Sequence, residues 1–135
     1  RLGIKEGKIF KDPIIEFYYK NDELNDPLVN NNHIISFGWS DKEELFKINS
    51  ISLKVNKILK KKFEEISISL IDFKLEFGRK TSDDSLVIAD EISPDSCRLC
   101  DVNNKEKFDK DIFRYDTGNL VEAYKKLLIR LGIIK

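Results

Sequence analysis

Residue types on which several common protein classes depend are scarce in this chain. It contains two cysteines, one histidine and no methionine among 135 residues. Two cysteines cannot build the disulfide framework of a small secreted domain, and one histidine leaves a histidine-based zinc site short of ligands. No apolar run approaches the ~20 residues that a membrane-spanning helix needs. These absences disfavour a secreted disulfide-rich protein and a membrane protein, and we expect a cytoplasmic one.

An excess of charge of either sign is also absent. Lys and Arg number 24 and Asp and Glu number 24, so the formal net charge is zero although 36% of the residues are charged. A nucleic-acid backbone or an anionic membrane attracts proteins with a positive excess. We therefore expect neither nucleic acid nor a membrane as a partner. A hydrophobic share of 41% over this length is enough for one folded domain.

The beginning of the chain predicts a fragment. Arg1-Leu2-Gly3 is not a natural translation start, and methionine is missing throughout. We expect residues 1–135 to be a fragment whose N-terminal part is missing.

Two principal helices are predicted from hydrophobic spacing. Ser40 and Glu43 fit a capping box at the start of a long helix. Its apolar residues recur at spacings of mostly three and four and mark one face: Leu45, Ile48, Ile51, Val55, Ile58, Leu59, Phe63 and Ile66. A final helix begins near Asn119 and stops before Gly132.

The rest of the chain predicts strands and loops. Residues 14–19 predict a buried strand, and the Asn- and Asp-rich residues 20–33 predict a loop. Residues 68–77 and 86–89 predict two strands of an antiparallel hairpin around a polar turn. Residues 91–101 are interpreted as a loop around Pro94. The predicted fold is α+β, with a mostly antiparallel sheet and the two helices.

The clearest candidate site lies in residues 70–78, which read LIDFKLEFG. Asp72, Lys74 and Glu76 occupy alternate positions, which share one face of a strand. The predicted hairpin would bring Asp90 near Glu76. Two carboxylates on paired strands can hold Mg²⁺, and Lys74 between them could contact a phosphate. The same alternation also fits the solvated face of an edge strand, so both interpretations stay open.

Other polar segments are weaker candidates. Arg98 ends a tight polar loop and is either a ligand for a phosphate or carboxylate or an ordinary surface arginine. The loop with Lys20 and Asp26 carries either a site or charge for solubility. The pair Cys97 and Cys100 is a weak zinc or redox motif, and we interpret it as incidental.

In order along the chain, these segments resemble the SAICAR synthetase family (phosphoribosylaminoimidazole-succinocarboxamide synthase) of purine biosynthesis. LIDFKLEFG resembles the family signature. The other matching segments are Arg1-Leu2-Gly3, Lys20-Asn21-Asp22 with Asp26-Pro27, Phe37-Gly38-Trp39, Ala89-Asp90-Glu91, Ser93-Pro94-Asp95 with Arg98, and Asp109-Lys110-Asp111 with Phe113-Arg114. The resemblance covers essentially the whole chain. It implies the C-terminal catalytic and substrate-binding lobe of the family's fold, with the N-terminal ATP-binding lobe missing.

The resemblance also implies a reaction and roles for residues. The family joins L-aspartate to carboxyaminoimidazole ribotide (CAIR), with ATP and Mg²⁺, through an acyl phosphate, and gives SAICAR, ADP and phosphate. By resemblance, Glu76 and Asp90 would hold Mg²⁺, and Asp72 and Lys74 would be the catalytic residues. The residues that would bind substrates are Arg98, for the ribotide phosphate, and Lys20, Asp26, Asp95, Lys110 and Arg114, which would line the cleft.

Several alternatives stay open. Acids on a hairpin beside a lysine would also suit a kinase-like Mg-ATP phosphotransferase. A non-catalytic nucleotide-binding module would bind ligand without turnover. Residues 1–135 alone could be inactive without the missing lobe, and homo-oligomerisation is left open. Cys97 and Cys100 depart from the family pattern, which has a small residue and an aromatic residue at these positions.

Overall fold

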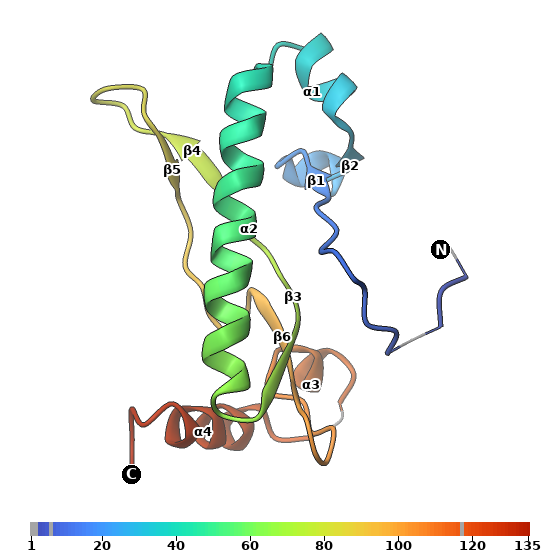
Figure 1. Cartoon of the computed structure of the whole chain (residues 1–135), viewed down its shortest axis with the longest axis vertical. Coiled ribbons are helices and arrows are strands. Elements are labelled where there is room, and N and C mark those ends of the chain that lie inside the picture. Colours follow the sequence, from blue (N-terminus) through green and yellow to red (C-terminus); the bar gives the residue numbers. More distant parts are fainter. Residues whose placement is uncertain (1–2, 6, 117) are drawn as a thin grey trace. The chain divides into compact units, whose positions relative to one another are not determined.

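The computed structural model describes residues 3–5, 7–116 and 118–135, so Arg1 and Leu2 of the sequence resemblance lie outside the described part. The chain divides into two compact units, Arg1–Leu53 and Lys54–Lys135. The elements, in chain order, are β1 (Phe17–Tyr18), η1 (Asp22–Leu24), β2 (Leu28–Val29), α1 (Asn31–Ser36), α2 (Lys42–Glu64), β3 (Ile68–Phe73), β4 (Phe77–Arg79), β5 (Leu86–Ile88), β6 (Cys97–Asp101), α3 (Asp111–Arg114) and α4 (Leu120–Arg130) (Figure 1). Helices with antiparallel strand pairs confirm the predicted α+β class.

The first unit contains a short antiparallel ladder. β1 pairs with β2, with Phe17 opposite Val29 and Tyr18 opposite Leu28. A strand lies within residues 14–19 as predicted, but the predicted length and burial are wrong, because β1 contains only two residues and the side chain of Ile14 is 65% exposed. Two strands of this length bury little side-chain area, so the apolar residues around them remain exposed.

The loop predicted over residues 20–33 also contains regular structure. It includes η1, β2 and the start of α1. Asn30 caps α1 through its side chain, which accepts the backbone N–H of His33, and the His33 side chain accepts the N–H of Asn30. Asn and Asp favour loops and helix caps for the same reason, since their short side chains bind nearby backbone groups. The loop prediction failed because composition does not separate these two uses.

The long helix α2 confirms the predicted first helix, with a different cap. The Asp41 carboxylate accepts the backbone N–H of Glu44 at 2.8 Å, and the Ser40 hydroxyl donates to the Glu44 carboxylate at 2.6 Å. The capping carboxylate is therefore one residue after the predicted Ser40, as expected for a negative charge at a helix start. Leu45 and Phe63 are buried on the predicted apolar face.

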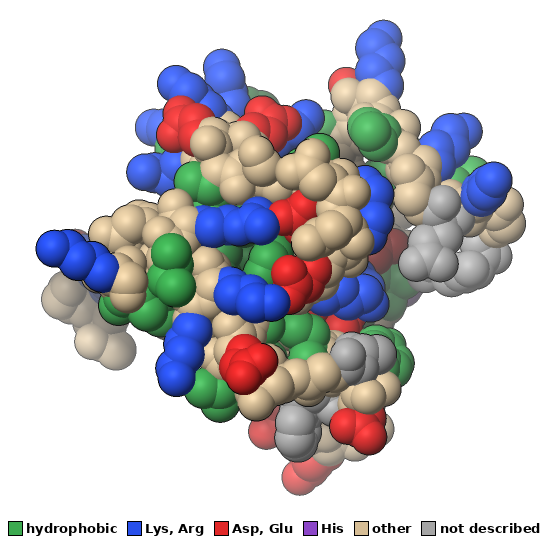
Figure 2. All heavy atoms as spheres, turned by 90° about the horizontal axis from the view of Figure 1, so that it is seen from below, with side chains coloured by type: hydrophobic (Ala, Val, Ile, Leu, Met, Phe, Trp, Pro, Cys, Tyr) green, Lys and Arg blue, Asp and Glu red, His purple; other side chains and the backbone are tan. Residues whose placement is uncertain are grey.

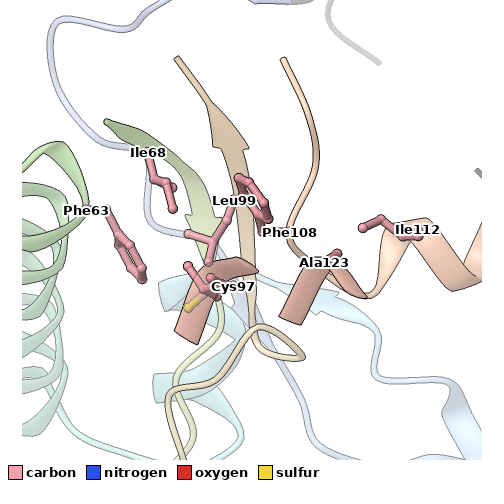
Figure 3. Packing of buried hydrophobic residues seen from close by; sticks show 8 residues of the cluster. Phe63, Ile68, Cys97, Leu99, Phe108, Ile112 and Ala123 are labelled. Carbon is pink, nitrogen blue, oxygen red and sulfur yellow. The ribbon is translucent and has the colours of Figure 1, made fainter. Parts of the chain in front are cut away.

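The second unit holds the larger core. Figure 3 shows its side chains around the strands β3 and β6. The cluster draws on α2, both strands, the segment before α3, α3 and α4, and consists of Phe63, Ile68, Cys97, Leu99, Phe108, Ile112, Ala123 and Leu127. The final helix is confirmed, because α4 begins after Asn119, whose side chain accepts the N–H groups of Val121 and Glu122, and ends before Gly132, whose φ is +69°. A positive φ favours glycine and stops the helix.

The strand pairing differs from the prediction. The strand predicted over residues 68–77 is two strands with different partners: β3 pairs with β6, and β4 pairs with β5. The predicted hairpin is confirmed for β4 and β5, where Phe77 lies opposite Ile88. The register of β3 shifts between Leu70 and Asp72, which marks a bulge in the ladder.

The loop predicted over residues 91–101 is also wrong in its second half. Residues 97–101 form β6, in which Cys97, Leu99 and Asp101 are buried while Arg98 is exposed. This is the alternation of a half-buried strand. The sequence did not indicate this strand, because an aspartate occupies one of its buried positions. Among the described residues, no helix combines the length and the apolar character needed to cross a membrane.

Candidate functional site

Most of the predicted site residues lie where the β3–β6 ladder is followed by the β4–β5 hairpin. The Lys74 N–H donates to the carbonyl of Ser96 at 2.8 Å, and the Ala89 N–H donates to the carbonyl of Glu76 at 2.9 Å. The Ser96 hydroxyl also donates to the carbonyl of Glu91 at 3.3 Å. The short link between β3 and β4 is therefore held by the loop before β6 and by the end of the hairpin.

Lys74, Glu76 and Asp90 form a cluster at this junction. The Lys74 Nζ lies 2.6 Å from Glu76 Oε1 and 3.9 Å from Asp90 Oδ2. Glu76 precedes β4 and Asp90 follows β5, so both carboxylates lie at the same end of the β4–β5 hairpin. Their side chains are 22% and 34% exposed, against 61% for Lys74. The two carboxylates thus converge on one cation.

Asp72 and Arg98 form a separate pair. They are opposite each other in the β3–β6 ladder, and the guanidinium contacts the carboxylate at two points, with Nε 2.9 Å from Oδ1 and Nη2 in contact with Oδ2. The hydrogen bond with Asp72 raises the pKa of Arg98, and burial opposes this effect. Two predictions are corrected here: Asp72 does not share a strand face with Lys74 and Glu76, because β3 ends at Phe73, and Arg98 lies in a strand, not in a loop.

The segment around α3 carries the next group of predicted residues. Lys110 Nζ lies 3.4 Å from Asp95 Oδ2, and Arg114 Nη1 lies 3.2 Å from Asp111 Oδ1. The Lys110 N–H also donates to the Pro94 carbonyl at 3.4 Å. The start of α3 is therefore attached to the loop before β6.

Lys20 and Asp26 belong to the first unit. The Asp26 carboxylate accepts the backbone N–H of Asn21 at 2.8 Å, and the Asp26 N–H donates to the Asn21 carbonyl at 3.1 Å. Asp26 and Asn25 have φ values of 45° and 55°, a region that Asp and Asn tolerate better than most residues. Asp26 thus closes the turn around η1, while Lys20 is exposed after β1.

Sequence reasoning missed one buried acidic residue beside this site. Asp109 is 2% exposed, and its carboxylate accepts the N–H groups of Leu99 and Asp111 at 2.8 and 2.9 Å. Asp109 was named from the sequence only as part of the matching segment with Lys110 and was given no role. The available signal was an acid two residues before a short helix, close to the position from which side chains cap helices.

The chemistry of the donors fits a hard cation in one place. Among the described residues, no three or more His, Cys, Asp or Glu side chains are grouped as metal ligands. Mg²⁺ needs fewer protein ligands, because it usually binds one or two carboxylates together with waters and phosphates. Glu76 and Asp90, arranged around the Lys74 ammonium, satisfy that requirement.

The two cysteines are separated by the strand that carries them. Cys97 faces the core, Cys100 is half-buried, and both are free thiols. Residues three apart in a strand point to opposite faces. Burial raises the pKa of the Cys97 thiol, which disfavours its reactive thiolate form.

The basic residues around position 105 lie on a surface of mixed charge. Figure 2 shows Lys and Arg side chains interspersed with Asp and Glu on one face of the molecule. A hollow of about 370 Å³ is lined by Lys105, Lys107 and Lys126 together with Glu106 and Glu122, among others. Lys126 Nζ lies 2.6 Å from Glu106 Oε1. This pairing is typical of a solvated surface on which both signs of charge alternate.

Comparisons with known proteins agree with the sequence resemblance. The family model of SAICAR synthetase matches residues 1–131. The phosphoribosylaminoimidazole-succinocarboxamide synthases of Anoxybacillus flavithermus and of Wolbachia pipientis subsp. Culex pipiens are 52% and 50% identical over 98% of this chain, and the matches cover 55% and 56% of those proteins. A solved SAICAR synthetase in complex with ADP is 48% identical, with a TM-score of 0.92 over 99% of this chain and 57% of its own. The chain thus spans about half the length of the curated relatives it matches, and it belongs to the SAICAR synthetase family.

Proposed function

We propose that residues 1–135 form the C-terminal, substrate-binding lobe of an ATP-dependent ligase that joins L-aspartate to CAIR. Membership of the SAICAR synthetase family and the ADP complex of a relative support this proposal. The observation that carries it is the convergence of Glu76 and Asp90 on one cation, Lys74. This is the charge arrangement that a metal ion with nucleotide phosphates needs.

The reaction calls for positioning and charge neutralisation more than for a reactive side chain. A carboxylate is a poor electrophile, so the CAIR carboxylate is first phosphorylated by ATP, which leaves ADP. The aspartate amine then attacks the carbonyl carbon of the acyl phosphate. The C–N bond forms, the C–O bond to the phosphate breaks, phosphate leaves, and the nitrogen releases one proton to solvent. Enzymes accelerate such steps mainly by orienting the reactants and stabilising developing charge.

Glu76 and Asp90 are the residues that would hold Mg²⁺. When bound there, the metal would neutralise negative charge on the nucleotide phosphates. Lys74 carries a flexible, exposed ammonium and would move from the carboxylates to a phosphate oxygen.

The remaining cations suit the anionic groups of the substrates. Arg98 would exchange part of its two-point contact with Asp72 for the ribotide phosphate, which accepts the same forked geometry. Lys110 and Arg114 would bind further anionic groups of CAIR or aspartate. Asp95, whose Oδ2 lies 3.4 Å from Lys110 Nζ, would join them. Lys20 and Asp26, in the first unit, are proposed as further substrate-binding residues.

A coupled assay of ADP release tests this function. The full-length protein is given ATP, Mg²⁺ and CAIR, with and without L-aspartate, and release that depends on aspartate is expected. Turnover that leaves phosphate on a stable product would instead indicate a kinase-like phosphotransferase. Nucleotide binding without any turnover would indicate a binding module, and either result would overturn the proposal.

A further inference from the structure

Asp109 is a buried carboxylate whose two oxygens bind different parts of the backbone. It is 2% exposed; Oδ2 accepts the N–H of Leu99 at 2.8 Å and Oδ1 accepts the N–H of Asp111 at 2.9 Å. Burying a carboxylate is costly unless hydrogen bonds compensate for the lost water. Its position therefore depends on these two contacts.

The two contacts join the edge of β6 to the start of α3. The Leu99 carbonyl accepts the N–H of Phe108 at 3.0 Å, as in a strand pair, but the Leu99 N–H donates to the Asp109 carboxylate. The side chain thus takes the place of a strand carbonyl, so the backbone can leave the strand edge. The second oxygen binds Asp111, the first residue of α3.

The segment held in this way carries cations that we assign to anionic substrate groups. Lys110 follows Asp109 directly, Arg114 ends α3, and Arg98 precedes Leu99 in β6. After the leading contribution of Asp72, the negative charges of Asp111 and Asp109 also raise the pKa of Arg98. The α3 segment and Arg98 are therefore electrostatic neighbours.

We propose that Asp109 is a positioning residue, which holds Lys110 and Arg114 beside Arg98 so that the three cations bind the anionic groups of the substrates together. This inference rests on the proposed function for the role of these cations. Asp109 itself is buried and acts through the backbone.

The test compares two buried aspartates in the full-length protein. Asp109→Asn keeps the shape but leaves one oxygen to serve two N–H groups. Asp101→Asn is the matched control, because Asp101 is 1% exposed and also accepts two backbone N–H groups, from Asn103 and Asn104. It lies at the other end of β6, about 10 Å along the strand from Arg98.

Two measurements are made on each variant. Amide hydrogen exchange over residues 109–114 should become on the order of tenfold faster in Asp109→Asn, since a charged hydrogen bond is lost there, and should be unchanged in Asp101→Asn. The KM for CAIR or aspartate should rise on the order of tenfold in Asp109→Asn, with the KM for ATP unchanged. Asp101→Asn should lower stability without changing any KM.

Each outcome decides the inference. Unchanged exchange over residues 109–114, or a KM shift no larger than in Asp101→Asn, overturns it. If the unmodified protein shows no aspartate-dependent ADP release, the proposed function fails separately. In that case faster exchange in Asp109→Asn alone still supports the holding role, and unchanged exchange still overturns it.

Discussion

Asp72 and Arg98, 26 residues apart, lie opposite each other in the β3–β6 ladder and form a two-point ion pair. Both were predicted as site residues, but in different roles and on different elements. Their side chains are 49% and 54% exposed. An ion pair this accessible contributes only ~0–1 kcal/mol to stability. We therefore interpret Asp72 as a residue that orients the Arg98 guanidinium, and not as a link that stabilises the fold.

Arg98→Ala should impair substrate binding far more than folding. Loss of charge-assisted hydrogen bonds to a phosphate is expected to raise the KM for CAIR roughly tenfold to 100-fold. Arg98→Lys should recover only part of this loss, because an ammonium lacks the forked geometry. Arg79→Ala is the control, since Arg79 is an exposed arginine in β4 without an assigned role. Steady-state kinetics and urea denaturation of the full-length variants provide the measurements, and equal effects at Arg79 and Arg98 would contradict the assignment.

Glu76→Gln and Asp90→Asn should each abolish turnover while the fold stays intact. Each removes one carboxylate from the pair that would hold Mg²⁺. We expect the rate of ADP release to fall at least ~100-fold. The residual ADP release should need a higher Mg²⁺ concentration to reach half of its maximum. Asp84→Asn, in the turn of the same hairpin, should leave both quantities unchanged. Magnesium titrations of ADP release, with circular dichroism to verify folding, provide the measurement. Native turnover in either variant removes the Mg²⁺ hypothesis.

Asp101 should contribute stability that is lost in acid. The backbone N–H of Asn104 chiefly lowers its pKa, and Arg130, whose Nη2 lies 2.5 Å from Oδ2, adds to this effect. A lowered pKa in the folded state means that the contribution is complete above the unfolded value of about 3.9 and disappears as the pH falls through the folded value. The free energy of unfolding, measured from pH 7 to pH 2.5, should therefore fall more in the unmodified protein than in Asp101→Asn. Parallel curves would argue against this role.

Ile68 and Ile71 in β3 allow a direct comparison of buried and exposed packing. Ile68 is 0% exposed and Ile71 is 60% exposed. Ile68→Val should lower the free energy of unfolding by ~0.5–1.5 kcal/mol, and Ile68→Ala by ~2–5 kcal/mol, because each leaves a cavity in the core. The same changes at Ile71 should stay within about 0.5 kcal/mol. Urea denaturation measures all four variants. Equal losses at both positions would contradict the difference in burial, and a larger loss at Ile71 would mean that β3 has the opposite face inward.

Features with a local cause were predictable from the sequence. The apolar spacing of α2 and the capping asparagine and terminal glycine of α4 act within a few residues, and both helices are present as predicted. The β4–β5 hairpin is also local, since its strands are joined by a short polar turn. The signature at residues 70–78 was enough to indicate the family.

The pairing of distant segments was not predictable in this way. β3 pairs with β6 across a hairpin inserted between them. The burial of Asp101 depends on backbone N–H groups of the turn that follows β6, and that of Asp109 on N–H groups of β6 and α3. A pattern of alternating residues shows that a strand has two faces, but it does not show which backbone edge will meet it.

Residue types and their spacing were enough to predict the family and the two principal helices, because both act over short stretches of the chain. Folding was needed to show that Asp72 pairs with Arg98, whereas Lys74 pairs with Glu76 and Asp90. The physical reason is that β3, which pairs with β6, ends at Phe73, and the next strand, β4, pairs with β5. Three charges that alternate in the sequence are thereby divided between two neighbouring clusters.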